Sequence, residues 1–135
     1  MRVYGKVSMK DFKVTKVEES KDGVVVVAVE GQVGIEEAAQ VSKFFEEIEN
    51  EGIVWVIVSL EGVDFISTAG VGALLYAVGG SRKRGGEIVF IEFSPKTKAV
   101  FEFLDLHDFI VTATDKESGL QVVKEIKSGT RPAEA

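Results

Sequence analysis

The stretch that decides the fold of this chain is residues 63–75, with the sequence VDFISTAGVGALL. It follows the most apolar run of the chain, residues 53–60, which is typical of a strand buried in a core. Beyond it, four apolar residues recur at the spacing of an amphipathic helix: Val71, Leu74, Leu75 and Val78. A buried strand therefore passes through a short loop into a helix, and two hydroxyl residues, Ser67 and Thr68, lie where the helix begins.

Outward from this stretch, strand-like and helix-like segments alternate. The expected strands, in chain order, are 12–17, 24–29, 53–60, 87–91 and 109–112. The expected helices cover 35–50, the segment after Thr68, a short segment that Ser94 caps and a last segment that Asp115 caps. A turn at Asp22-Gly23 joins the first two strands into a hairpin. This order predicts an α/β fold: one domain with a mixed, mostly parallel sheet of about five strands and four helices.

Length and composition agree with a single globular domain. The chain has 135 residues, of which 45% are hydrophobic, and this is typical of one domain. Its expected parts are an N-terminal extension over 1–10, the domain over 11–127 and a flexible tail over 128–135. The net charge of −6 argues against a nucleic acid partner, because phosphate binding needs clustered Lys and Arg. No apolar run approaches the length of about 18 residues that a membrane span needs. Without cysteine or a signal-peptide pattern, a cytoplasmic location is expected.

Catalytic machinery is not expected. His107 is the only histidine and the chain has no cysteine, so a metal site or an acid–base pair would lack converging partners. The glycines at 70–72 and 79–80 do not have the spacing of a phosphate-binding loop. Ser67 does not lie in the Gly-x-Ser-x-Gly turn of a hydrolase. We therefore expect no catalytic residue, no bound metal and no cofactor.

The hydroxyl pair leaves two interpretations open. Ser and Thr are preferred N-caps, so Ser67 or Thr68 could serve only to begin the helix. A phosphate on either residue would add about −1.5 to −2 charges at a helix start, which tolerates an anion. The fold would survive that modification, whereas a partner docked on the same surface would lose contacts or meet repulsion. Capping and a binding switch are compatible.

Residues 63–75 resemble the signature of STAS domains, specifically those of bacterial anti-sigma factor antagonists. In that signature an apolar strand leads into Asp-Ser-Ser/Thr-Gly or Ser-Ser-Ala-Gly, followed by small and apolar helix residues. The resemblance spans residues 11–127, and the segments 30–33, 85–88 and 104–109 match the family in character.

The resemblance implies a binding module without enzymatic activity. Its expected partner is an anti-sigma factor of the histidine-kinase-like ATPase fold, which the unphosphorylated antagonist binds, freeing a sigma factor. That partner is also a serine/threonine kinase, and phosphorylation of the antagonist breaks the complex. A serine/threonine phosphatase reverses the modification.

The resemblance also implies which residues carry the switch. Aligned on Gly70, Thr68 is the last hydroxyl before the glycine and the favoured phosphorylation site, with Ser67 as the alternative. The residues expected at the partner surface are Gly31, Gln32, Asp64, Ile66, Ser67, Thr68, Ala69, Gly70 and Val71. Two positions depart from the family: Ala69 replaces a hydroxyl, and Gly34 stands where many members have Asp before the first helix. A difference in partner specificity is expected from the second.

Two other functions fit the same sequence. A STAS domain could serve another regulatory or lipid-transport assembly, which different co-purifying partners would reveal. A small nucleotide-binding α/β protein is the alternative from another class, and binding of labelled ATP or GTP would reveal it.

Overall fold

The structure, a computed structural model, describes residues 6–130. The strands are β1 (Lys6–Met9), β2 (Phe12–Glu19), β3 (Val24–Val33), β4 (Trp55–Ile66), β5 (Glu87–Ile91) and β6 (Val111–Ala113). The helices are α1 (Ile35–Asn50), α2 (Thr68–Lys83), α3 (Pro95–Phe103) and α4 (Lys116–Ser128). The predicted α/β fold, with four helices in this part of the chain, is confirmed.

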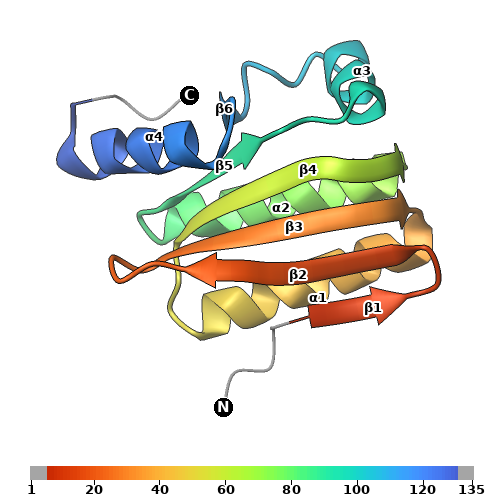
Figure 1. Cartoon of the computed structure of the whole chain (residues 1–135), viewed down its shortest axis with the longest axis horizontal. Helices are drawn as coiled ribbons and strands as arrows, with labels where there is room; N and C mark the ends of the chain where they lie inside the picture. The colour runs from red at the N-terminus through yellow and green to blue at the C-terminus, as the bar shows by residue number, and fades with distance from the viewer. Residues whose placement is uncertain (1–5, 131–135) are drawn as a thin grey trace.

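One mixed sheet runs through the molecule in the order β1-β2-β3-β4-β5-β6 (Figure 1). The first three strands are antiparallel neighbours, and β3 to β6 are parallel. The prediction of about five strands was wrong by one, because the described residues form six. The additional strand is β1, which pairs with β2 from Lys6 opposite Thr15 to Met9 opposite Phe12. Its four residues are at most half-buried, so its sequence carries only a weak strand pattern.

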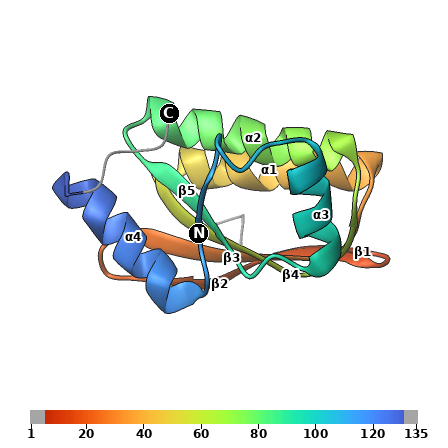
Figure 2. The same ribbon diagram turned by 90° about the horizontal axis from the view of Figure 1, so that it is seen from above.

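Helices cover both faces of the sheet, but unequally. α1 and α2 lie side by side on one face, and α4 lies on the other (Figures 1 and 2). The larger core lies on the first face and includes Phe44, Leu60, Leu74 and Phe90, all at most 2% exposed. A smaller core joins Val122 and Val123 of α4 to the opposite face. The central strands are buried on both sides, which explains their nearly continuous apolar sequences.

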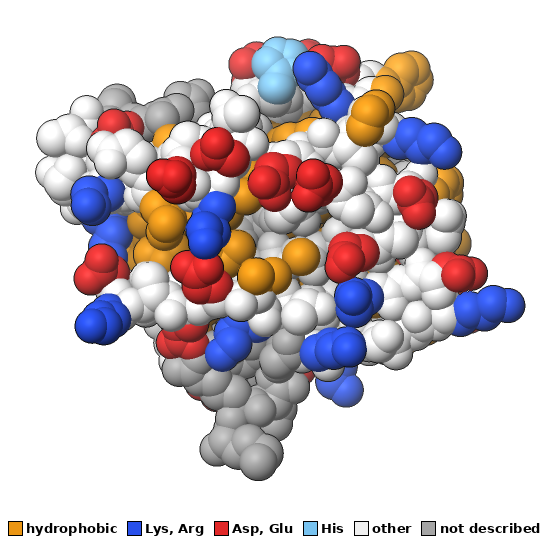
Figure 3. All heavy atoms as spheres, viewed as in Figure 1, with side chains coloured by type: hydrophobic (Ala, Val, Ile, Leu, Met, Phe, Trp, Pro, Cys, Tyr) orange, Lys and Arg blue, Asp and Glu red, His pale blue; other side chains and the backbone are white. Residues whose placement is uncertain are grey.

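The part of the sheet that α4 leaves uncovered is polar. Acidic and basic side chains are interspersed over this face (Figure 3). Two ion pairs lie among them, Lys13 Nζ with Glu30 Oε2 at 3.6 Å and Lys116 Nζ with Glu18 Oε1 at 2.8 Å. This is the arrangement expected of the antiparallel part of a sheet with one solvated face.

The central strand β4 is longer than predicted. Its first half pairs with β5, from Trp55 to Ser59, and its second half continues along β3 until Ile66 lies opposite Val33. Gly62 and Asp64 interrupt the apolar pattern of this half, which therefore reads as a loop in the sequence. β4 thus ends directly before Ser67.

Local signals at the helix ends are confirmed. Ser94 Oγ accepts a hydrogen bond from Thr97 N at 3.2 Å, and Asp115 Oδ1 accepts one from Ser118 N at 2.9 Å. The backbone and side-chain hydrogen bonds of Ser118 hold the pKa of the Asp115 carboxyl below its usual value. Of the tail predicted over 128–135, Ser128 closes α4, and residues 131–135 lie outside the described part, as do residues 1–5 of the predicted extension.

The glycines at 79–80 lie inside α2. A side chain on Gly80 would collide with the carboxylate of Glu49 on α1. Only the end of the flexible Glu49 side chain would have to move to make room for it.

Candidate functional site

A single residue, Ser67, connects β4 to α2. Its backbone N donates to Val33 O on the neighbouring strand at 2.8 Å. Its Oγ accepts a hydrogen bond from Gly70 N at 3.1 Å, so Ser67 is the N-cap of α2. Its carbonyl accepts from Val71 N at 3.0 Å. Ser67 is therefore committed to the turn through its backbone and its side chain.

Gly70 is the position at which this turn meets the core. A Cβ there would lie 2.8 Å from Ile66 Cγ1, 2.9 Å from Val33 Cγ1 and 3.2 Å from Val33 O. Only glycine allows the first turn of α2 to approach the ends of β3 and β4 this closely. The spacing from Ser67 to Gly70 in the sequence thus has a structural reason.

Thr68 differs from Ser67 in both exposure and bonding. It is the first residue of α2, it is exposed, and its hydroxyl makes no hydrogen bond with any residue that the structure describes. The first turn of α2 contains no acidic side chain, whereas α1 has Glu36 and Glu37 in its first turn. The positive end of the α2 dipole is therefore uncompensated, which favours an anion attached there.

The predicted site residues on β3 lie beside β4. Gly31 pairs with Val63, and Gln32 pairs with Phe65. A hollow of about 350 Å³ opens at this place, lined by Ser8, Asp11, Phe12, Lys13, Glu30, Gly31, Gln32 and Asp64. The fold thus brings Gly31, Gln32 and Asp64 together near the strand ends. Gly31 has a φ of 91°, and a side chain there would collide with the carbonyl of Asp11, so glycine is required by the backbone.

The nine residues expected at the partner surface separate by burial. Four are exposed: Gln32, Asp64, Thr68 and Ala69. Gly31 and Ser67 are partly buried. Ile66, Gly70 and Val71 are buried and hold the surface from beneath.

Two exposed apolar residues near this surface were not found by sequence reasoning. Phe65, the residue before Ile66, is 48% exposed, and Ile35, at the start of α1, is 78% exposed. Ile35 follows Val33 by two residues, and the Val33 carbonyl accepts a hydrogen bond from Ser67 N. Ile35 and Phe65 therefore lie at the same end of the sheet as Thr68. The available signal for Ile35 was its place outside the buried stripe of α1, which contains Ala38, Val41, Phe45 and Ile48.

The remaining candidate, His107, lies on the loop after α3 and is exposed. Its Nδ1 is 3.8 Å from Asp105 Oδ1, and its Nε2 is 3.8 Å from Asp108 Oδ1, which is longer than a hydrogen bond. Among residues 6–130, no three His, Cys, Asp or Glu side chains gather closely enough to hold a metal ion. Within the same part of the chain, no helix is both long and apolar enough to cross a membrane.

The sequence model of the STAS domain matches residues 16–125, from within β2 to within α4. The chain belongs to the STAS domain family. The match includes the whole β4–Ser67–α2 junction and therefore the two hydroxyls of this STAS domain.

Individual relatives are similar over most of the chain. A Bordetella bronchiseptica protein named "Putative anti-sigma factor antagonist BtrV" is 26% identical over 103 residues, which are 76% of this chain and 89% of that protein. The crystal structure of an anti-sigma factor antagonist from Mycobacterium paratuberculosis superposes with a TM-score of 0.72 at 20% identity, covering 87% of this chain and 99% of that one. The Bacillus cell fate determinant SpoIIAA, in its phosphorylated form, superposes with a TM-score of 0.62 at 22% identity, covering 82% and 98%. These structures share the fold of this STAS domain.

Proposed function

We propose that this STAS domain protein is an anti-sigma factor antagonist that phosphorylation of Thr68 switches off. The observation that carries the proposal is the difference between the two hydroxyls. Ser67 is used by the fold as an N-cap, whereas Thr68 is exposed at an uncompensated helix start. The relative named as an anti-sigma factor antagonist, and the phosphorylated state in which SpoIIAA has been solved, support this assignment.

The docking surface in this proposal is the set of exposed residues around the start of α2, which we call the switch surface. It consists of Gln32, Ile35, Asp64, Phe65, Thr68 and Ala69. Ile35 and Phe65 are large apolar side chains in contact with solvent, which is typical of residues that a protein partner covers. Ile66, Gly70 and Val71 do not reach the surface and position it instead.

The partner in this proposal is an anti-sigma factor of the histidine-kinase-like ATPase fold. In the unphosphorylated state the switch surface binds it, and its sigma factor is released. The same partner transfers the γ-phosphoryl group of ATP to Thr68 Oγ1, which loses its proton, and a serine/threonine phosphatase hydrolyses the phosphate again. The catalytic groups belong to these partners, so the STAS domain is a substrate and not an enzyme. Sigma factor regulation would place the protein in the cytoplasm.

Charge explains why phosphorylation would release the partner without unfolding the STAS domain. The phosphate adds about −1.5 to −2 charges. At the start of α2 these charges lie against free backbone N–H groups, which tolerate them. On the switch surface a docked partner would have to take these charges out of water.

Mapping the acceptor residue tests the proposal directly. Purified protein, its co-purified kinase and ATP should give a single phosphate on Thr68 by mass spectrometry, and Thr68→Ala should abolish it. Ser67→Ala is the matched control and should still be phosphorylated. It should lose about 1 kcal/mol of stability, because the bond from Gly70 N to the cap disappears. Phosphate on Ser67, or equal labelling of Thr68→Ala, would reject Thr68 as the switch.

A further inference from the structure

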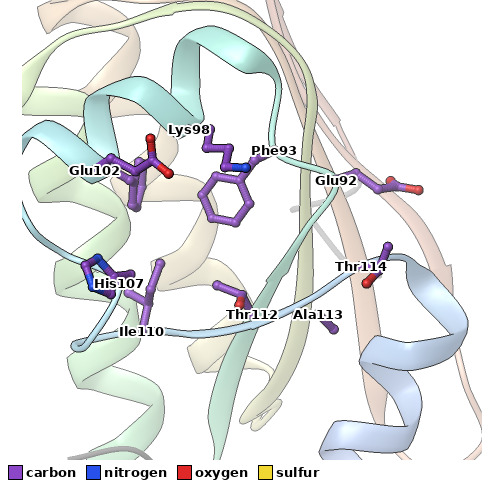
Figure 4. Close-up of a pocket in the computed structure, with 10 residues that line it drawn as sticks. Glu92, Phe93, Lys98, Glu102, His107, Ile110, Thr112, Ala113 and Thr114 are labelled. Atoms are coloured by element: carbon purple, nitrogen blue, oxygen red, sulfur yellow. The ribbon is translucent and has the colours of Figure 1, made fainter.

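A second hollow lies between α3 and the edge strand β6, and none of its lining residues belongs to the switch surface (Figure 4). Its volume is about 390 Å³, within the range of small-molecule sites. α3, which follows β5, packs on the same core as α1 and α2, whereas α4, which follows β6, packs on the opposite face. After β5 the chain turns to one face of the sheet, and after β6 it turns to the other. The crevice lies between these two turns, past the carboxyl ends of both strands.

The floor of the crevice is aromatic and apolar. The rings of Phe93 and Phe101 meet edge to face, with centroids 5.3 Å apart and an interplanar angle of 82°. Phe101 and Ile110 are 3% exposed, whereas Phe93 is only partly buried and points into the hollow in Figure 4. The floor therefore offers an accessible ring face on a fixed support.

The residue before Phe93, Glu92, has an uncommon backbone conformation at the end of β5. Glu92 has a φ of 55°, a left-handed value that a residue with a side chain seldom adopts. Its Oε1 accepts a hydrogen bond from Ser59 Oγ at 2.8 Å, and its carboxylate points away from the hollow (Figure 4). Such strained residues cluster at functional sites. Here the strained residue immediately precedes the ring that enters the crevice.

The rim of the crevice carries one positive and one negative side chain. Lys98 and Glu102 lie one turn apart on α3, and both line the mouth above Phe93 (Figure 4). Both are exposed, and neither forms an ion pair with the other or with any other residue in the described part of the chain. Thr112 and Thr114 add hydroxyl groups on the side of β6. Two opposite charges thus lie at the mouth of a crevice with an apolar floor.

We propose that this crevice binds a free amino acid with an apolar side chain. Its ammonium group would face Glu102, its carboxylate would face Lys98, and its side chain would pack on Phe93 and Phe101. A zwitterion satisfies both charges, whereas a purely apolar ligand would desolvate them without compensation. A phosphate ligand would be repelled by Glu102 and would bring no positive group to pair with it. A volume of about 390 Å³ suits a metabolite of this size.

Titration of the isotope-labelled protein with L-phenylalanine, followed by NMR, tests the proposal. Saturable shifts should appear at the amides of Glu102, Ile110, Thr112 and Thr114, with a Kd of about 1 mM or tighter. Two analogues isolate the charges: 3-phenylpropanoate lacks the ammonium group, and 2-phenylethylamine lacks the carboxylate. Each should bind at least about tenfold more weakly, because a charge-assisted contact is lost. Glycine, which has no side chain to pack on the floor, should not saturate the site.

Variants on α3 connect the binding to the rim. Lys98→Gln and Glu102→Gln should each weaken L-phenylalanine about tenfold. Lys96→Gln is the matched control, because Lys96 is also exposed on α3 but does not line the crevice. Thr68→Ala should bind like the unchanged protein, so the result is independent of the switch. Shifts absent up to about 10 mM, equal binding of all three phenyl compounds, or rim variants that behave like Lys96→Gln would each overturn the proposal.

Discussion

Thr68→Glu should weaken binding of the anti-sigma factor at least about 30-fold while leaving the fold intact. A carboxylate at this exposed position would be buried by the docked partner. Leaving a charge unpaired in an interface costs about 2–5 kcal/mol, which corresponds to a loss of roughly 30-fold to several thousand-fold in affinity. Calorimetric titration of the purified partner with the variant measures this loss.

The same substitution should not destabilise the STAS domain. A negative side chain in the first turn of a helix is neutral to stabilising, by about 0.3–1 kcal/mol, and the first turn of α2 has no other acidic residue. The melting temperature should therefore stay within a few degrees of that of the unchanged protein. Thermal unfolding of both proteins separates a switched surface from an unfolded one.

Thr68→Gln is the matched control, because it has the size of Glu without the charge. It should retain most of the affinity, with a loss below about tenfold. Equal losses for Gln and Glu would mean that shape, not charge, governs docking at Thr68. Full affinity of Thr68→Glu would place the partner elsewhere on the molecule. An unfolded Thr68→Glu would show that the residue is chiefly structural.

The sequence predicted the elements whose signals are local. α1 begins and ends at the residues predicted, 35 and 50, and the caps at Ser94 and Asp115 need only neighbouring backbone N–H groups. The order of strands and helices followed from the alternation of these signals. The junction at Ser67 was predicted for the same reason, although the strand before it was expected to end at Leu60.

The features that the sequence did not predict depend on contacts between distant segments. β1 exists because β2 offers a free edge, and the second half of β4 exists because β3 continues beside it. The two hydroxyls at the site could not be told apart in sequence, since either could cap a helix. Only the hydrogen bond from Gly70 N assigned that role to Ser67.

The ion pair between Arg82 and Glu87 is another contact that only the structure reveals. Glu87 begins β5 and its side chain is 0% exposed. Arg82 Nε donates to both of its carboxylate oxygens, at 2.9 and 3.0 Å, and Ile88 N donates at 3.0 Å. Arg82 also donates through a terminal guanidinium nitrogen to Phe109 O at 3.1 Å. One side chain thus ties the end of α2 to the start of β5 and to the segment before β6.

Arg82→Ala should therefore lower the free energy of unfolding by about 3–5 kcal/mol at neutral pH, because a buried carboxylate loses its counter-ion. Arg84→Ala is the matched control. Arg84 pairs with Glu49 at 3.7 Å near the surface, where its side chain is 46% exposed, so the loss should be about 1 kcal/mol or less. Urea unfolding of the two variants and the unchanged protein measures both differences. Equal losses would contradict the special role of the buried pair.

The pH dependence of the Arg82→Ala deficit identifies its cause. Burial raises the pKa of the Glu87 carboxyl, and the hydrogen bond and charge of Arg82 oppose this rise. A raised pKa means that the folded state holds the proton of Glu87 more tightly than the unfolded state does. The protonated carboxyl therefore contributes to folding stability below the unfolded pKa of 4.5, and this contribution is lost as pH rises through the folded pKa. Removing Arg82 raises the pKa of Glu87 further, so the deficit should grow as pH rises above the unfolded value of 4.5. Adding Glu87→Gln should flatten this slope and recover stability at neutral pH, whereas a deficit independent of pH would assign the loss to packing of Arg82.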